Sequence, residues 1–307
     1  MDVQSKKRVK PKIGIVILNW NNFSDTKETL RALERQTYKN YELVIVDGKS
    51  SDNSTKKIKR EFPQYHYIFL KDDTGYSGGN NVGIKYLLDR NVDFVLSMNN
   101  DVIMESRCIQ ELVSFAMKNK KVGIVGPRMY SYYEKDLFEQ SGGCVSIFRS
   151  KPMPKWIKES EAPKRLSKPY EVKKLPGALI MLRANVIKEI GLMDERFFLY
   201  YGDTDWQKRV SDEGYKQMVV PSAKAYHKVS ATTGKGSIKV LYYDSRDFLF
   251  YVLKHHSLLA LTYSFFRSYI QKSSRIVDSE LENKLKQLKY LNLAYLHFLI
   301  GKSGKGI

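Results

Sequence analysis

The sequence predicts an α/β fold in which a mostly parallel sheet is flanked by helices, with a helical extension at the C-terminus. Two observations predict it. Short apolar runs alternate with helical patterns through the first 126 residues, which is typical of βαβ units and a parallel sheet. From about residue 240 the apolar spacing is helical. We therefore expect a basic tail at residues 1–10, one large domain at residues 11–240 and a helical extension at residues 241–307.

Five apolar runs in the first 126 residues are the expected strands. The run at residues 13–18 is continuous, as a strand buried on both faces should be. The others cover residues 41–46, 65–70, 94–98 and 122–125. Helices are expected at residues 25–36, 52–61 and 105–119, and a Gly/Asn loop followed by a helix to about Asp89 is expected after the third run. Asp25 and Glu28 have capping-box spacing, and Asp52 can cap the second helix.

Residues 127–175 lose this alternation. Prolines at positions 152, 154, 163 and 169 lie among charged residues there, so we expect a long loop region. Beyond it, we expect a strand at residues 175–182, a helix at 184–190 and a last strand at 219–221. Leucines at positions 281, 285, 288 and 291 have helical spacing.

The chain is strongly basic. Its 307 residues contain 52 Lys and Arg against 33 Asp and Glu, which gives a net charge of +19 and a pI near 9.6. This balance favours anionic partners, namely phosphorylated substrates, an anionic membrane surface or nucleic acid.

The cysteines and the apolar segments indicate a cytoplasmic protein. Cys108 and Cys144 provide neither a disulfide framework nor zinc-ligand spacing. The N-terminus is polar and basic to Lys12, so we expect no signal peptide. Residues 248–270 are the best membrane-span candidate, but charged residues and histidines interrupt them. The longest uninterrupted run, residues 257–266, is short against the roughly 20 apolar residues of a span.

Polar side chains follow three of the predicted strands, where each strand ends. Asn19 follows the first, Asp47 the second and Asn99-Asn100-Asp101 the fourth. Parallel strands release their carboxyl ends at one edge of the sheet, so we expect Asn19, Asp47 and Asp101 to converge where such sheets bind nucleotides. An acidic strand tip suits a hard cation that also binds substrate phosphates. The alternative at each position is a turn or capping residue.

A glycine-rich segment precedes the expected third helix. It reads Gly75-Tyr76-Ser77-Gly78-Gly79-Asn80-Asn81-Val82-Gly83, and it lacks the G-x-G-x-x-G spacing of dinucleotide-binding proteins, which argues against a dehydrogenase. Its glycines would let the backbone approach a ligand closely, with the following helix N-terminus facing phosphate. A flexible turn is the alternative.

As a set, these segments resemble glycosyltransferase family 2, most closely its rhamnosyltransferase-like branch. The resemblance rests on Asn19-Trp20-Asn21, residues 46–54, the glycine-rich segment and Asn99-Asn100-Asp101, in that order and spacing. It extends through Gly177-Ala178, residues 194–198, Asp203-Thr204-Asp205-Trp206 with Arg209, and His227. It covers about residues 11–250.

The resemblance implies a GT-A fold, with a donor half at about residues 11–126 and an acceptor half at about 127–240. It also implies a nucleotide-sugar donor, a Mg²⁺ or Mn²⁺ cofactor and inversion at the anomeric carbon. The branch points to dTDP-rhamnose or a UDP-sugar as donor, and to a hydroxyl of a glycan or lipid-linked acceptor in polysaccharide and cell-envelope biosynthesis.

The resemblance also assigns roles to individual residues. Asp203 matches the aspartate that deprotonates the acceptor, Asp101 the usual metal ligand and His227 a histidine that joins the metal or diphosphate in some members. The donor-binding positions implied in this way, which include the base-binding aspartate Asp47, are Asn19, Trp20, Asn21, Asp47, Lys49, Gly78, Gly79, Asn80, Asn99 and Asn100. The acceptor-side positions are Gly177, Ala178 and Trp206.

Two positions differ from the family pattern. Asn99 occupies the first position of the D-x-D-like motif, so only Asp101 offers a carboxylate. Gly202 stands where an acid usually precedes the catalytic aspartate, which leaves Asp203 and Asp205 as candidate acids. Residues two apart on a helix do not share a face.

Structural alternatives exist for two of these residues. Asp205 could cap its helix or pair with Arg209, and His227 could be a packing histidine. The chemistry itself requires charge stabilisation on the departing diphosphate, which a cation supplies as a Lewis acid, and a carboxylate to take the proton of the sugar hydroxyl.

Two other classes of function compete with this interpretation. A nucleic-acid-binding protein would need a basic face with aromatic stacking positions. The basic residues are dispersed, so we expect no nucleic-acid partner. A non-catalytic sugar-nucleotide-binding or membrane-associated scaffold is the second rival, and donor turnover separates it from an enzyme.

The C-terminal region combines apolar faces with Lys254, Arg267, Lys272 and Arg275. This pattern suits peripheral docking on the anionic inner face of the cell membrane. The alternative is packing on the catalytic domain or on a second subunit in a homodimer.

Overall fold

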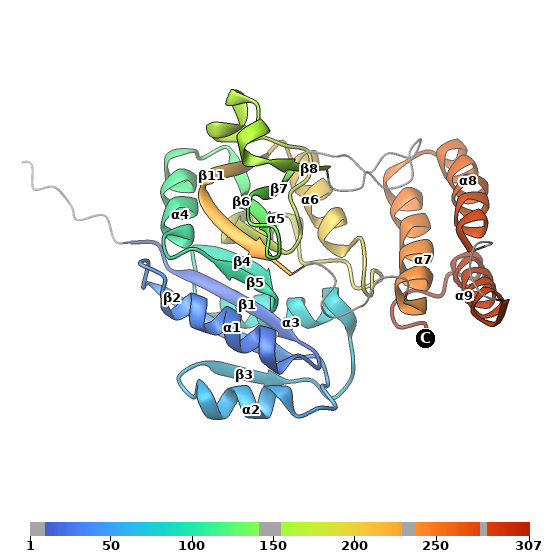
Figure 1. Cartoon of the computed structure of the whole chain (residues 1–307), viewed down its shortest axis with the longest axis horizontal. Coiled ribbons are helices and arrows are strands. Elements are labelled where there is room, and N and C mark those ends of the chain that lie inside the picture. The colour runs from blue at the N-terminus through green and yellow to red at the C-terminus, as the bar shows by residue number, and fades with distance from the viewer. Residues whose placement is uncertain (1–9, 141–154, 229–236, 277–280) are drawn as a thin grey trace, which may run out of the picture.

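A mixed sheet with helices on both faces forms most of the molecule, and three further helices form its C-terminal part (Figure 1). The computed structural model describes residues 10–140, 155–228, 237–276 and 281–307. The strand order is β3-β2-β1-β4-β10-β6-β11-β5. The predicted class, an α/β sheet flanked by helices with a helical C-terminal extension, is confirmed. The N-terminal tail before Lys10, and Cys144, lie outside the described residues.

The first half of the sheet is parallel, as predicted. Strands β1 (Ile13–Asn19), β2 (Tyr41–Asp47), β3 (His66–Phe69) and β4 (Phe94–Asn99) pair in register around β1. The helices that connect or follow them are α1 (Phe23–Glu34), α2 (Ser54–Glu61), α3 (Gly75–Leu88) and α4 (Cys108–Lys118). Parallel order brings the carboxyl ends of β1, β2 and β4 to one edge.

The second half of the sheet mixes directions. Strand β10 (Leu179–Arg183) lies antiparallel between β4 and β6 (Val122–Ser131), and β11 (Lys216–His227) is parallel to β6. The short strand β5 (Val102–Met104) pairs antiparallel with the end of β11. Helices α5 (Ala184–Ile190) and α6 (Gly202–Asp212) separate β10 from β11. The strand β5 and most of β11 were not predicted.

The two faces of the sheet bury separate apolar cores. Alternate residues of β1 point to opposite sides, so Ile13, Ile15 and Ile17 pack with α1, α2 and α4. Val16 points the other way, into a core shared with α3, α5 and α6. The continuous apolar run of β1 therefore reflects burial on both faces, as expected.

Three element predictions were wrong. Helix α1 begins before Asp25, because the Asn22 side chain accepts the backbone N–H of Asp25 and caps the helix. The glycine-rich segment is not a loop but the first part of α3, which begins at Gly75. The region 127–175 is not a long loop where it is described. It contains the end of β6, strands β7 (Leu137–Gln140), β8 (Lys155–Lys158) and β9 (Tyr170–Glu171), and 3-10 turns η1 (Glu159–Glu161) and η2 (Lys164–Ser167).

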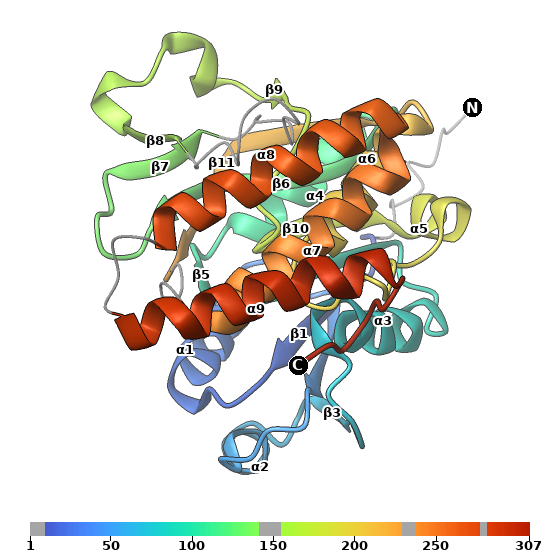
Figure 2. The ribbon, with the colours of Figure 1, turned by 90° about the vertical axis from the view of Figure 1, so that its right-hand side faces the viewer.

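The C-terminal helices α7 (Ile238–His255), α8 (Leu258–Ile276) and α9 (Leu281–Leu299) pack together beside the domain (Figure 2). Their apolar core includes Phe197, Phe198 and Tyr201 from the segment before α6. Lys254 and Lys272 face inward, toward Asp205 and Asp244 respectively. Internal packing therefore accounts for these two basic residues. No helix in the described ranges is both long and apolar enough to span a membrane.

Candidate active site

The carboxyl ends of β1, β2 and β4 bring the predicted polar residues to one edge of the sheet. The pairing register places Asn19 beside Asp47 and Leu18 beside Asn99. The antiparallel approach of β10 adds Ala178, whose carbonyl accepts the backbone N–H of Asn99 (2.8 Å). The predicted convergence at this edge is therefore confirmed.

Asn19 and Asn100 form the buried framework of this edge. The Asn19 amide donates to Thr55 Oγ1 (2.7 Å) and Ser54 Oγ (2.9 Å), and Asn19 Oδ1 accepts from Thr26 Oγ1 (2.7 Å) and from Asn100 Nδ2 (3.1 Å). Both asparagines are buried, and both are among the expected donor-binding positions. Their side chains support the site by fixing strand ends to helices, so we propose no direct ligand contact for them.

The loops after β1 and β2 hold each other in place. Asp47 Oδ1 accepts the backbone N–H of Ser50 (2.8 Å), and Asn21 Oδ1 accepts that of Ser51 (2.7 Å). Asn21 and Lys49 both have positive φ angles, 49° and 68°. Among the described residues, no side-chain hydrogen bond reaches the second carboxylate oxygen of Asp47. Asp47 is thus held in a fixed orientation at the donor end of the sheet.

Two more donor-side candidates lie at the margins of this edge. The half-buried Trp20 has the ammonium of Lys239, from α7, over its ring at 4.8 Å. The exposed Lys49 lies 3.3 Å from Asp72. Both residues keep surface that a ligand could reach.

The glycines of α3 serve helix packing. A Cβ on Gly79 would lie 2.5 Å from Leu18 Cδ1, and one on Gly83 would overlap Val16. Gly78 is similarly closed by Thr74, at 2.7 Å. The side of each glycine on which a Cβ would stand is therefore filled by the sheet or by the preceding turn, and the donor-binding role of Gly78 and Gly79 stays a prediction. Asn80 is also buried, and its side chain bonds Ser97 and the Tyr76 carbonyl.

Asp101 and His227 meet because β5 pairs with β11. His227 is opposite Val102 in that ladder, and its Nε2 lies 3.3 Å from Asp101 Oδ1. This oxygen is buried and has no hydrogen-bond partner in the described structure. An unsatisfied buried carboxylate oxygen beside an imidazole nitrogen suits a divalent cation. The described residues contain no cluster of three or more such ligands, so phosphate oxygens would have to complete the coordination.

The two acids at the start of α6 have different environments. Asp203 is partly exposed, and within the described residues its side chain accepts one hydrogen bond, from its neighbour Thr204 (3.3 Å). Asp205 is completely buried and pairs with Arg209 (2.9 Å), Lys254 (2.6 Å) and His255 (2.8 Å). Of the structural alternatives considered for Asp205, the structure shows the pairing with Arg209.

Burial disfavours the charged form of Asp205, but hydrogen bonds from His255 and Lys254 outweigh it and hold its pKa below the usual value. An ionised, fully paired carboxylate has no free oxygen for substrate. Trp206, next in the helix, is also completely buried and donates its indole N–H to the Gly191 carbonyl. We therefore propose no acceptor contact for Trp206.

Gly177 and Tyr76 flank Asp203. A Cβ on Gly177 would overlap the Asp203 carboxylate, so the missing side chain makes room for this acid. The Tyr76 hydroxyl donates to the Gly177 carbonyl (3.2 Å). Burial raises the pKa of Tyr76, and the charges of Asp203 and Asp101 raise it further. Tyr76 thus lies within electrostatic range of both the candidate base and the candidate metal ligand.

Sequence reasoning missed two residues beside this group. Tyr76 was assigned to a flexible loop, although its place in the motif was visible. Glu139, on β7, was hidden in the region expected to be a loop. The pKa of Glu139 is raised, mainly by burial and also by the charge of Asp203. The charges of Lys174 and His227 oppose this shift. Phe138 points into a core on one side of β7, so alternation turns Glu139 to the other.

The fold and this edge together define a GT-A glycosyltransferase, a confirmation of the predicted fold. The family model described as glycosyl transferase family 2 matches residues 14–191. The chain therefore belongs to glycosyl transferase family 2, as its motifs predicted, and it is a glycosyltransferase.

Named relatives agree with the predicted branch. A low-salt glycan biosynthesis hexosyltransferase, Agl10 of Haloferax volcanii, is 27% identical over 76% of this chain and 73% of its own. The dTDP-rhamnosyl transferase RfbF of Shigella flexneri is 23% identical over 86% and 88%. The N-acetylglucosaminyl-diphospho-decaprenol L-rhamnosyltransferase of Mycobacterium tuberculosis is 20% identical over 80% and 85%.

Solved structures support the fold alone. A mannosyltransferase from Pyrobaculum calidifontis, in complex with GDP-Man and Mn²⁺, is 13% identical with a TM-score of 0.58, over 96% of this chain and 89% of that one. GalNAc-T7 with UDP, GalNAc and Mn²⁺ is 15% identical with a TM-score of 0.62, over 92% of this chain and 55% of that one. This chain therefore spans about half the length of the GalNAc-T7 chain.

Proposed function

We propose that the protein transfers a sugar from a UDP- or dTDP-linked donor to a hydroxyl group of a lipid-linked or glycan acceptor, with inversion in a single displacement. The observation that carries the proposal is the contrast between the two acids of α6. Asp205 is buried and paired with Arg209, Lys254 and His255, whereas Asp203 is partly exposed and lies against Gly177. Of these two acids, Asp203 is the one available as a base.

In this proposal, Asp203 accepts the proton of the acceptor hydroxyl as that oxygen attacks the anomeric carbon. The bond from the sugar to the diphosphate breaks as the new glycosidic bond forms, and the nucleoside diphosphate leaves. Tyr76 fixes the Gly177 carbonyl, and with it the backbone against which Asp203 rests. Glu139 lies on the acceptor side, within the electrostatic range of Asp203.

Asp101 Oδ1 and His227 Nε2 would hold the cation, Mg²⁺ or Mn²⁺. When bound, such a cation stabilises negative charge on the leaving diphosphate as a Lewis acid. The support is the unsatisfied Asp101 oxygen, together with relatives of this fold that were solved with Mn²⁺. Because the pair offers one carboxylate and one imidazole, we expect metal affinity to depend on the donor phosphates.

The nucleotide would bind at the ends of β1 and β2. The free oxygen of Asp47 can accept the imide N–H of uracil or thymine, which cytosine lacks. The relatives named for dTDP-rhamnose and for a diphospho-decaprenol acceptor support a dTDP-sugar and a lipid-linked acceptor. A thermal-shift screen of nucleotide sugars with Mn²⁺ tests the donor class, since a ligand at 100 times its Kd stabilises by about 2.7 kcal/mol.

The experiment that tests the proposed base compares Asp203→Asn with Asp205→Asn. Asp203→Asn should keep donor affinity and reduce turnover about 100-fold or more, the range expected for a positioned general base. Asp205→Asn should mainly lower the melting temperature, because it removes the buried charge that pairs with Arg209 and Lys254. Calorimetric donor titration, initial rates and thermal unfolding are measured on each. A catalytically dead Asp205→Asn that is fully stable, beside an active Asp203→Asn, would show that the base is misassigned.

A further inference from the structure

Helix α8 carries an apolar row on its outer face. Leu259, Tyr263, Phe266 and Ile270 recur every three or four residues, and they are 81%, 44%, 61% and 67% exposed. The opposite face of the helix is already used, because Phe265 and Tyr269 pack edge-on against Tyr295 of α9. An α-helix of this kind has one apolar face toward the domain and a second toward solvent.

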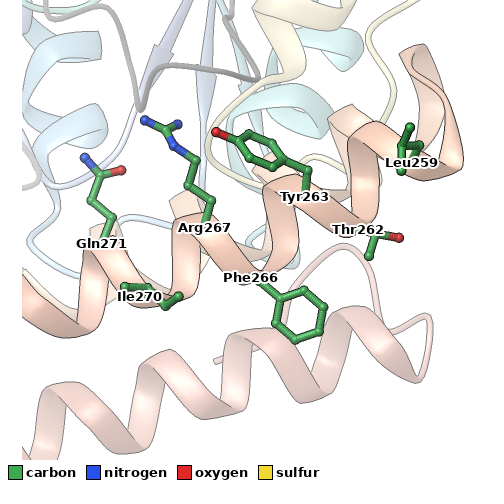
Figure 3. A pocket seen from close by; sticks show the side chains of 7 residues that line it. All are labelled: Leu259, Thr262, Tyr263, Phe266, Arg267, Ile270 and Gln271. Atoms are coloured by element: carbon green, nitrogen blue, oxygen red, sulfur yellow. The ribbon is translucent and has the colours of Figure 1, made fainter.

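Basic residues accompany the outer row, and acidic residues do not. Residues 258–276 contain no Asp or Glu. The Arg267 guanidinium lies 5.9 Å from the centre of the Tyr263 ring, so it sits beside the row (Figure 3). Arg275 is exposed near the end of the helix, but it follows Ile270 by five residues and so lies on a different face from the row. Lys272 turns inward to Asp244 and Ser245 and does not contribute to this surface.

Helix α9 adds a second stretch of the same character. Leu285, Leu296, Leu299 and Ile300 are exposed. Lys286 and Lys289 are exposed on the same helix, near Leu285. Large apolar side chains exposed in a row beside cations are typical of an interaction surface rather than of ordinary surface variation.

We propose that the outer row of α8, defined by Leu259, Tyr263, Phe266 and Ile270, docks on an anionic lipid bilayer, with Arg267 at the headgroup level. Charge decides between a bilayer and a second copy of the chain. A twofold contact through this row would place two acid-free, basic surfaces against each other, whereas anionic lipids would neutralise them. The proposal does not depend on the identity of the base, the metal or the donor.

Vesicle flotation of the full chain tests the proposal. Wild-type protein should float with phosphatidylcholine vesicles that contain phosphatidylglycerol, and less well at high salt, because salt screens the attraction. It should not float with pure phosphatidylcholine. Phe266→Ser combined with Ile270→Ser should weaken binding by about tenfold or more, since two large apolar side chains would no longer be buried in the bilayer. Arg267→Glu should weaken binding to the anionic vesicles as well.

Tyr133→Ser is the matched control, because Tyr133 is 73% exposed but lies far along the chain on the turn after β6. It should bind vesicles as the wild type does. Absence of wild-type flotation at low salt, or equal flotation of the α8 double variant, would overturn the proposal. So would a wild-type dimer in light scattering that the double variant abolishes, which would assign the row to a second copy. Transfer to a water-soluble acceptor should be equal in wild type and double variant, so failure of docking remains distinct from failure of the proposed function.

Discussion

Asp203 and Asp205 lie two positions apart on one helix, and their neighbours give them opposite properties. Helical geometry turns Asp205 toward α7, where Lys254 and His255 reach it. The same geometry turns Asp203 toward Gly177, which lies just before the start of β10. The sequence reduced the base to two candidates, but only the packing of α7, far along the chain, separates their roles.

A substitution at Gly177 tests the placement of Asp203 while leaving the aspartate itself in the sequence. In Gly177→Ala the new methyl group would overlap the Asp203 carboxylate and force it to move. We expect kcat to fall about tenfold to 100-fold, because small displacements of a reacting group are costly, while donor affinity and melting temperature change little. Initial rates and calorimetry measure these quantities. An unchanged kcat in a variant that folds normally would argue against Asp203 as the base.

Asp101 tests the proposed cation site. Asp101→Ala should remove the part of donor affinity that Mn²⁺ provides and leave metal-free nucleotide binding intact, because it deletes the carboxylate that lies 3.3 Å from His227 Nε2. Calorimetric titration with nucleoside diphosphate, with and without Mn²⁺, measures this difference. Glu171→Ala, at an exposed salt bridge, is the control and should behave like wild type. Persistence of the full Mn²⁺ effect in Asp101→Ala would rule out the site.

Much of the candidate site could be predicted from the sequence. The rest could not, for physical reasons. Asp47, Asp101 and Asn19 were found because parallel strands release polar residues at one edge. Ligand and framework roles could not be separated, since the hydrogen-bond partners of the Asn19 side chain lie in α1, in α2 and in the turn after β4. Tyr76 and Glu139 were missed because their segments were expected to be loops.

At the scale of elements, α3 shows how glycine misleads when the sequence is read alone. Glycine usually weakens a helix, and a run of them suggests a loop. Here Gly79 and Gly83 are one turn apart and face Leu18 and Val16 of β1. The packing gained by the close approach of α3 and β1 outweighs the low helix propensity of glycine, and the helix begins at Gly75.

Gly83→Ala tests this packing role. The added methyl group would overlap Val16, and overpacking of this kind costs about 1–3 kcal/mol, more than the helix propensity gained. We expect a lower free energy of unfolding without added ligand, measured by urea denaturation. Lys85→Ala, exposed on the same helix, should be neutral. A Gly83→Ala protein of wild-type stability would contradict the packing role.

The other element-level errors have a similar origin. Strand β5 spans Val102–Met104 and gains its order from β11, which lies far away in sequence. Strands β7 and β8 pair with each other, but the sequence of neither strand alternates between apolar and polar residues. Local periodicity predicted the parallel half well, because each βα unit there is continuous in the sequence, and it failed where strands pair across long separations.

At the scale of the whole molecule, the C-terminal helices hold the segment that precedes the proposed base, Asp203. Asp247 of α7 is buried, pairs with Arg246 (2.8 Å) and accepts the backbone N–H groups of Leu199 and Tyr200. Phe198 stacks on Tyr243 at 4.8 Å. Residues 197–201 are therefore held from α7 directly before Asp203.

Asp247 gives this contact a pH dependence. Burial raises its pKa to about 7, although Arg246 opposes the shift. The folded protein therefore holds a proton that the unfolded chain releases near pH 4, and the stability contributed by this group falls as pH rises from about 4 to about 7. The melting-temperature advantage of wild type over Asp247→Asn should shrink across that window and stay constant above about pH 8. A difference that grows with pH across the window would contradict the assignment.

The salt-bridged Asp205 also limits how this enzyme can be recombined. Its partners Lys254 and His255 lie on α7, and Arg209 lies on α6. Grafting the C-terminal helices of a homologue onto this catalytic domain would leave a buried carboxylate facing foreign side chains, and an unpaired buried charge costs about 3–5 kcal/mol. A functional chimera must therefore carry α6 and α7 together, and natural drift at Asp205 should require compensating changes at Lys254 or His255.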